Sequence, residues 1–433
     1  MRVLVLGALI GAPVAVAAYF FLKAVAAAQE WVFTTLPGDL GFDGEPTLWP
    51  LVPVAVAGLL VALTLRYLPG TGGHKPAEGF KAGGGVDPAD LPGITLAAFL
   101  TLSLGVVLGP EAPLIAMGAG LGVLAVRMLN RDAPETAVMV IGAAGSFAAV
   151  STLLGSPIIG AFLLMEAAGI GGGMMGVVLL PGLLAAGVGT LIFVGLDNWT
   201  GYGTFSLAIP DIPQFSSPTI GEFLWAIAIG LAAAVLGTSI RRGALALQPV
   251  VERRAVVLMP IVGLGIGLLA VIFAEATDHR SSEVLFSGQD ALPSLIQGSA
   301  GWTAGALIML VICKGLAYAL ALSCFRGGPV FPAMFIGAVG GIALSHLPGL
   351  PMIAGAAMGI GAMTAVMLGL PLTAVLLATL FMSADGIALS PLVIVAVVVA
   401  YVVAERLTPP QPNAAVGSVS GQADRTPALA KGR

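Results

Sequence analysis

The chain has 433 residues, of which 58% are hydrophobic and only 9% are charged. A soluble domain carries roughly 25% charged residues, so this composition excludes a soluble globular protein and predicts an integral membrane protein. The net charge of −4, without any basic block, gives no sign of a nucleic-acid partner.

Apolar runs recur along the whole chain. Several fall short of the roughly 20 residues that a straight membrane span needs. The 60 glycines and 30 prolines are typical of broken helices, which a membrane tolerates only where protein or a water-filled cavity surrounds the break. We therefore predict an all-α integral membrane fold of tilted and broken helices. The runs cover residues 3–21, 51–65, 91–108, 223–240, 258–274, 304–322 and 391–404.

The first run begins directly after Met1 and Arg2 and could pass for a signal peptide. Because more spans follow, we predict an uncleaved first helix. Loop lysines and arginines set the orientation of the spans, and they predict a multi-pass protein of the cell membrane with both termini in the cytoplasm. Residues 409–433 are rich in Ala, Gly, Ser and Pro, which predicts a disordered cytoplasmic tail. The basic, cytoplasmic segments are 66–90, 127–135, 241–254 and the end of the chain, and the acidic, outer segments are 29–50, 197–222 and 275–290.

An internal repeat is the most informative pattern. The sequence Gly-Pro-x-x-Pro at 109–113 recurs at 328–332, and the same offset matches Gly118 with Gly337 and Gly122 with Gly341. A second glycine–proline pair follows each copy, at 155–159 and at 369–373. The alternative is chance similarity in a glycine-rich membrane sequence.

Loop charge places the start of the span before Gly109 inside and the start of the span before Gly328 outside. The two copies then enter the membrane from opposite sides, which is an inverted-topology repeat with halves 1–210 and 211–408. Transport proteins use this architecture to place a substrate site where the halves meet.

The two helix breaks suit an anion. A helix N-terminus exposes unpaired N–H groups and carries about half a positive charge, and glycine lets the backbone approach a ligand closely. Several such ends attract an anion without the full charge that would hold it too tightly for conduction. Glu111 follows one break, so its carboxylate can stand in for the anion as a tethered gate. The alternative is a plain partner of the helix dipole.

These motifs resemble those of the CLC chloride channel and transporter family. The sequence at 109–113 is similar to its G-K/R-E-G-P motif, 70–74 to G-S-G-I-P, and 328–332 to G-x-F-x-P, and the resemblance covers residues 1–408. It implies a CLC-like homodimer in the lipid bilayer, with one pore per subunit for chloride or another small anion and with Glu111 as the gate. By position, the anion-binding residues are Thr71, Gly72, Gly109, Glu111, Gly328, Val330 and Phe331.

Two departures concern proton coupling and the inner mouth. Proton-coupled members carry a glutamate directly after the position of Glu166, and here that place holds Ala167. Glu166 is then either a proton-path residue or a partner for backbone groups at a buried break. The tyrosine expected after the last helix has no counterpart, since Tyr401 lies too early.

We therefore predict a glutamate-gated chloride channel without proton coupling. The alternative is a chloride/proton antiporter of the same fold. An intramembrane enzyme is a third reading, but the sequence contains neither H-E-x-x-H nor G-x-S-x-G, and we predict no cofactor and no metal.

Three further side chains have two readings each. Lys314 either raises the potential near the pore or has a structural partner, and Arg326 either attracts anions or is a flanking charge. His74 is either a pH sensor or an exposed loop residue. We expect Cys313 and Cys324 to be packing residues.

Overall fold

The computed structural model describes residues 2–42, 44, 46–80, 86–169, 173–201, 215 and 217–408. The predicted tail, 409–433, and the predicted boundary between the halves at 210 and 211 lie outside these residues.

The described residues form an all-helical membrane protein, as predicted. Eight helices are long and apolar enough to cross a membrane, and several shorter apolar helices accompany them. The first of the eight spans joins α1 and α2 through a π-helical turn, Trp31–Thr35. The helices are α1 (Arg2–Glu30), α2 (Leu36–Asp39), α3 (Leu51–Tyr67), α4 (Leu91–Ser103), α5 (Glu111–Leu129), α6 (Glu135–Leu153), α7 (Pro157–Ala168), α8 (Gly173–Thr200), α9 (Ile220–Glu252), α10 (Ala255–Thr277), α11 (Ala291–Gln297), α12 (Ala304–Cys324), α13 (Val330–Leu344), α14 (Met352–Leu368), α15 (Pro371–Phe381) and α16 (Gly386–Leu407).

Some helices differ from the apolar runs of the sequence. Helices α8 and α14 match none of those runs. Helix α9 continues to Glu252, so most of the segment 241–254 is helical rather than a loop. Arginine is a good helix former. Arginines that indicate the side of the membrane can therefore lie within a helix.

The glycines that match between the repeat copies have the same structural role. A Cβ atom added at Gly118 would lie 2.4 Å from the Gly145 carbonyl oxygen of α6, and one added at Gly337 would lie 2.2 Å from the Gly359 oxygen of α14. Gly122 and Gly341 pack equally closely against the same two helices. Each copy of the motif therefore starts a helix that packs, through bare backbone, on the helix that follows it.

The second glycine–proline pair also starts two matching helices. Gly155 and Gly369 both have positive φ angles, 63° and 71°, shortly before α7 and α15 begin.

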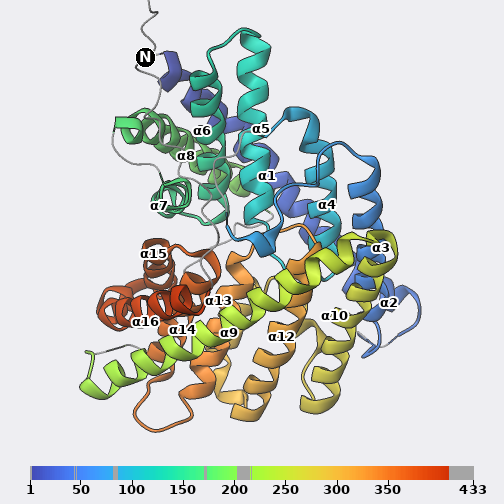
Figure 1. Ribbon diagram of the computed structural model, residues 1–433, viewed down its shortest axis with the longest axis vertical. Helices are drawn as coiled ribbons and strands as arrows, with labels where there is room; N and C mark the ends of the chain where they lie inside the picture. Colours follow the sequence, from blue (N-terminus) through green and yellow to red (C-terminus); the bar gives the residue numbers. More distant parts are fainter. Residues whose placement is uncertain are drawn as a thin grey trace, which may run out of the picture.

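Figure 1 shows the blue-to-green helices filling one side of the view and the yellow-to-red helices the other. Cys313 and Cys324 are buried and free, as expected of packing residues.

Candidate anion site

Gly109 and Gly328 meet inside the molecule and join the two repeat copies. The N–H of Gly109 donates to the carbonyl of Gly328 at 2.8 Å, and the N–H of Gly328 donates to the carbonyl of Gly109 at 2.6 Å. The two hydrogen bonds form an isolated antiparallel bridge. The two helix breaks marked by the repeat therefore meet within one chain.

Glu111 lies directly beside this bridge. Its side chain is 1% exposed, and Oε1 accepts a hydrogen bond of 2.8 Å from the backbone N–H of Phe331. Within the described residues, Oε2 is buried and has no hydrogen-bond partner. A Cβ atom added at Gly328 would lie 1.7 Å from Oε2, and one added at Gly109 would lie 2.3 Å from it. Both glycines are therefore needed to make room for the carboxylate.

Two helix N-termini supply the electrostatics of this site. Helices α5 and α13 begin after Pro110 and Pro329, and neither proline residue provides a side-chain cap. Their first N–H groups thus remain available to a negative group. The phenol of Tyr318 donates to the Pro329 carbonyl at 2.7 Å and fixes the start of α13. Val330, the first residue of α13, is fully buried next to Phe331.

The loop with Thr71 and Gly72 forms its hydrogen bonds away from the Glu111 carboxylate. The Thr71 hydroxyl donates to the Gly73 carbonyl at 3.3 Å, within its own loop, and Thr71 is exposed. Neither Thr71 nor Gly72 has a described hydrogen bond to Glu111. The structure thus brings together Gly109, Glu111, Gly328 and Phe331, and the anion-binding role of Thr71 and Gly72 stays a prediction.

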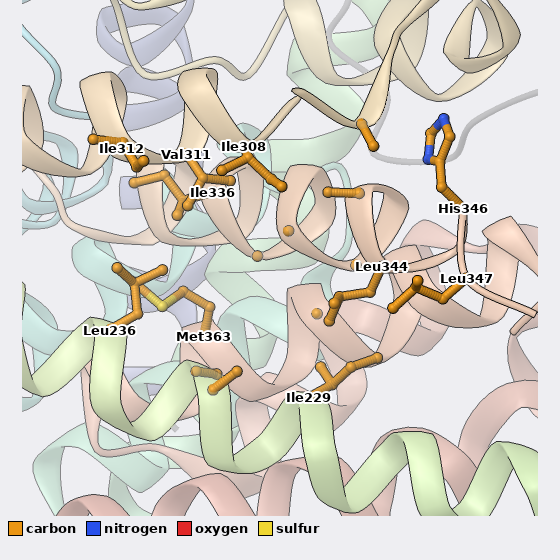
Figure 2. A pocket seen from close by; sticks show the side chains of 18 residues that line it. Ile229, Leu236, Ile308, Val311, Ile312, Ile336, Leu344, His346, Leu347 and Met363 are labelled. Atoms are coloured by element: carbon orange, nitrogen blue, oxygen red, sulfur yellow. The ribbon is translucent and has the colours of Figure 1, made fainter. Parts of the chain in front are cut away.

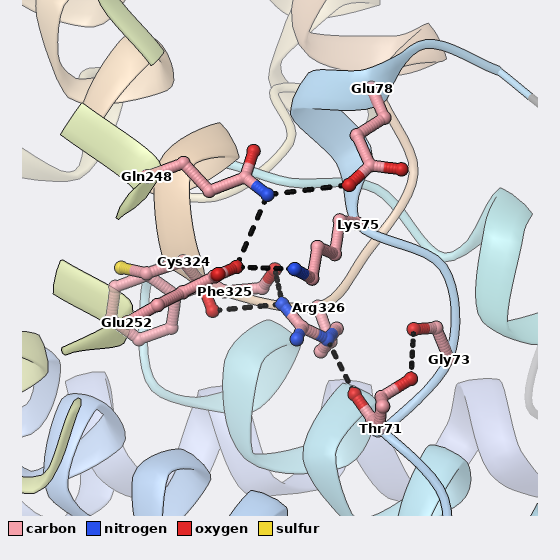
Figure 3. Close-up of polar contacts among 9 residues, drawn as sticks. All are labelled: Thr71, Gly73, Lys75, Glu78, Gln248, Glu252, Cys324, Phe325 and Arg326. Carbon is pink, nitrogen blue, oxygen red and sulfur yellow. Dashed lines mark hydrogen bonds and ion pairs between the residues drawn. The ribbon is translucent and has the colours of Figure 1, made fainter. Parts of the chain in front are cut away.

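A network of polar side chains fixes that loop (Figure 3). Arg326 donates from Nε to the Thr71 carbonyl at 2.9 Å and from one terminal nitrogen to the carbonyls of Cys324 and Phe325. Lys75 forms an ion pair of 2.6 Å with Glu252 at the end of α9. These contacts favour a structural role for Arg326.

His74 belongs to the same loop and is half-buried. Its Nε2 lies 2.7 Å from the Gly79 carbonyl oxygen. His74 therefore differs from the fully exposed loop histidine that was one of the two readings of this residue.

Glu166 binds the start of α15. Its Oε1 accepts from the N–H of Leu372 at 2.9 Å, and its Oε2 accepts from both the N–H and the hydroxyl of Thr373 at 2.7 and 2.6 Å. At the matching start of α7, the Ser156 side chain provides the cap, whereas Leu370 provides none before α15. Glu166 therefore replaces a missing N-cap, which favours the backbone-partner reading.

Lys314 is fully buried, and its contacts are structural. Its ammonium donates to three successive carbonyls, those of Glu283, Val284 and Leu285, at 2.8–3.1 Å. It also lies 4.4 Å from the centre of the Phe335 ring. Burial raises the pKa of the nearby Glu283 carboxyl above its ordinary value, and the charge of Lys314 opposes this shift. The sequence could not reveal these partners, because they are backbone atoms of a distant loop.

A cavity of about 130 Å³ lies beside the glutamate site, and its largely apolar wall carries a few polar side chains such as Gln29 and Gln289. Leu108 and Pro110, which flank the first glycine, form part of its wall. Lys23 on α1 and Asp290 before α11 bring opposite charges to it. No sequence pattern indicates this cavity, because its lining comes from five separate segments.

The comparison with known families settles what kind of protein this is. The profile of the family described as "Voltage gated chloride channel" matches residues 57–405. The chain belongs to the CLC family.

Relatives and solved structures agree with this assignment. "Putative ion-transport protein YfeO" of Escherichia coli O139:H28 (strain E24377A / ETEC) is 30% identical over 335 residues, which cover 76% of each chain. A slow cyanobacterial Cl⁻/H⁺ antiporter has a TM-score of 0.76 at 22% identity, with 94% of this chain and 95% of that chain covered. A CLC-type fluoride/proton antiporter has a TM-score of 0.69 at 20% identity, with the same coverage. These two structures show that the chain has the CLC fold.

Proposed function

We propose that this CLC protein conducts chloride or a similar small anion past the Gly109–Gly328 bridge, with Glu111 as its gate. The observation that carries the proposal is the Glu111 carboxylate, which accepts the Phe331 N–H at 2.8 Å where two helix N-termini meet. A permeating anion uses the same donor, so carboxylate and anion compete for one place.

The unpaired oxygen of Glu111 favours release of the gate. A buried charged group with an unsatisfied acceptor costs more than the roughly 1–3 kcal/mol of a neutral one. Protonation of the carboxyl, or movement of the side chain toward Lys23 in the cavity beside Pro110, reduces this cost and leaves the Phe331 N–H to the anion.

The first test is Glu111→Gln in chloride-loaded liposomes. The neutral amide holds the Phe331 N–H less strongly, because hydrogen bonds to charged groups contribute about 1.5–3 kcal/mol. We therefore expect chloride efflux at neutral pH to rise about tenfold or more, and its dependence on pH to disappear. Glu135→Gln, an exposed residue in the first turn of α6, is the control. Unchanged efflux with an unchanged pH response would remove Glu111 from the gating role.

We further propose that conduction is not coupled to protons. Ala167 follows Glu166, and Glu166 uses both carboxylate oxygens to cap α15. A carboxylate engaged in this way is poorly suited to carry protons. The second candidate, a chloride/proton antiporter, is favoured by the two structural neighbours, whose descriptions are those of antiporters.

Chloride and proton movement measured together separates these candidates. For a channel, a chloride gradient drives no uphill proton flux into the liposomes. For an antiporter it does, and Glu166→Gln then abolishes the proton flux while chloride transport continues.

The loop charges support a protein of the cell membrane with both termini in the cytoplasm. Reporter fusions at the end of the chain and in the loop that follows α10 test this orientation. Reporters active on the same side of the membrane would contradict it.

A further inference from the structure

An apolar groove runs between four helices of the second repeat copy. Its volume is about 350 Å³, and its walls come from α9, α12, α13 and α14. Helix α9 packs on α12 and α14, and the groove separates most of α9 from α13. Figure 2 shows the groove extending from Leu236 and Met363 at one end to His346 and Leu347 at the other. We call this feature the α9–α13 groove.

A glycine on α13 keeps this groove open. Gly337 and Gly341 face α14, where an added Cβ atom would collide with backbone carbonyl oxygens. Gly340, between them, lines the groove, and a Cβ atom added there would meet no atom within 4 Å. One wall of the groove is therefore bare backbone next to open space.

The groove is continuous with the apolar outer surface of the protein. Ile308 and Ile312 of α12 line it and are also 51% and 50% exposed. In a membrane-spanning chain, such surfaces face the hydrocarbon of the bilayer. An apolar groove open to that region is filled by hydrocarbon chains rather than by water.

One end of the groove becomes polar. His346 and Leu347 also line a surface recess whose other walls include Thr219, Glu222 and Ser345. From Ile229 to Leu236 the groove follows α9 for about 10 Å, at 1.5 Å per residue. An apolar channel that leads into a polar recess at a helix end has the polarity of an acyl chain joined to a headgroup.

We propose that the α9–α13 groove binds one acyl chain of a membrane phospholipid, with the headgroup over the recess beside His346. The lipid then contacts α13, the helix whose first turn provides the Phe331 N–H to Glu111. The lipid site does not depend on the proposed function, because it rests on the shape and polarity of the groove alone.

The test is photolabelling of the full chain in lipid vesicles. The protein is reconstituted into phosphatidylethanolamine and phosphatidylglycerol vesicles with a trace of phospholipid that carries a diazirine in its acyl chain. After illumination, mass spectrometry locates the labelled residues. We expect label on groove residues behind the opening, such as Leu236 and Ile336.

Two variants with the same substitution sharpen the result. Gly340→Phe fills the groove, and we expect it to lose the label at Leu236 and Ile336. Gly243→Phe is the matched control, because an added Cβ atom at Gly243 also meets open space on α9 but lies outside the groove. We expect Gly243→Phe to keep the label.

Three results would overturn the proposal. The first is label confined to outward-facing residues of the parent protein, a result that does not depend on the folding of any variant. The second is label that persists equally in both phenylalanine variants. Finally, a disulfide formed between two chains by Gly340→Cys would show that a second copy of the protein occupies the groove.

Discussion

Gly328 has no room for any side chain, because the Glu111 carboxylate lies where its Cβ atom would be. The same space is the place that we assign to a passing anion. A methyl group at this position therefore collides with the Glu111 carboxylate and also occupies space that the anion needs. The packing of α13 stays as it is.

We expect Gly328→Ala to lower chloride efflux about tenfold or more, since overpacking a site costs about 1–3 kcal/mol. The liposome efflux assay measures the effect, and a thermal melt reports on folding. Gly340→Ala is the control, because it places the same methyl group in open space on α13, the helix that begins two residues after Gly328. Efflux equal to that of the parent protein would show that the carboxylate lies outside the ion path.

Lys314 gives a second prediction for a single residue. Lys314→Met leaves three buried carbonyls without their donor, so we expect the free energy of unfolding to fall by about 1–3 kcal/mol. Lys75→Met removes a partly exposed ion pair and is expected to change it by less than about 1 kcal/mol. Denaturant titration in detergent measures both. Equal stability of the two variants would contradict the role assigned to Lys314.

At the level of helices, α7 and α15 show how the repeat copies have diverged. The α7 start is capped by its own Ser156, whereas α15 depends on Glu166 from the other copy. A local contact in one copy has thus become a contact between the copies.

Glu166→Ala should loosen the first turn of α15. Loss of an N-cap costs about 1–2 kcal/mol, so we expect faster hydrogen exchange at the amides of Leu372 and Thr373. The start of α7, which keeps its own cap, provides the internal control. Unchanged exchange at Leu372 and Thr373 would show that other contacts hold α15.

The sequence predicted the helices that matter for the site but not every helix. Glycine and proline mark the N-termini of α5 and α13 directly, and the repeat located their meeting point. Helices α8 and α14 were missed. Helix α8 is long and apolar enough to span a membrane, so the sequence did contain its signal. Helix α14, with 17 residues, is shorter than the roughly 20 residues of a straight span. The partners of Lys314 and Arg326 were also missed, since backbone atoms of distant segments leave no pattern in a sequence. For Glu166, backbone groups at a helix break were one of the two readings, but the sequence did not identify α15 as the helix concerned.

For the molecule as a whole, the large apolar surface leaves room for self-association. Exposed side chains such as Leu180, Leu191 and Ile387 extend across helices of both repeat copies. Membership of the CLC family leads us to expect a homodimer.

We expect fluorescently labelled chains in dilute vesicles to bleach in two steps. Crosslinking in the same vesicles should give a species of twice the 43.3 kDa chain mass. The control is a monomeric membrane protein labelled to the same extent. A single bleaching step at every protein-to-lipid ratio would contradict the homodimer.

The bridge between Gly109 and Gly328 also sets an order of events during biosynthesis. Its two glycines lie 219 residues apart in the sequence, and a ribosome adds about 5–20 residues per second. The early part of the chain therefore spends about 10–45 s in the translocon or bilayer with the polar backbone of Gly109 unmatched. Nascent chains stalled before residue 328 should thus be sensitive to membrane proteases and require insertion chaperones, and this requirement should end when the second break is released.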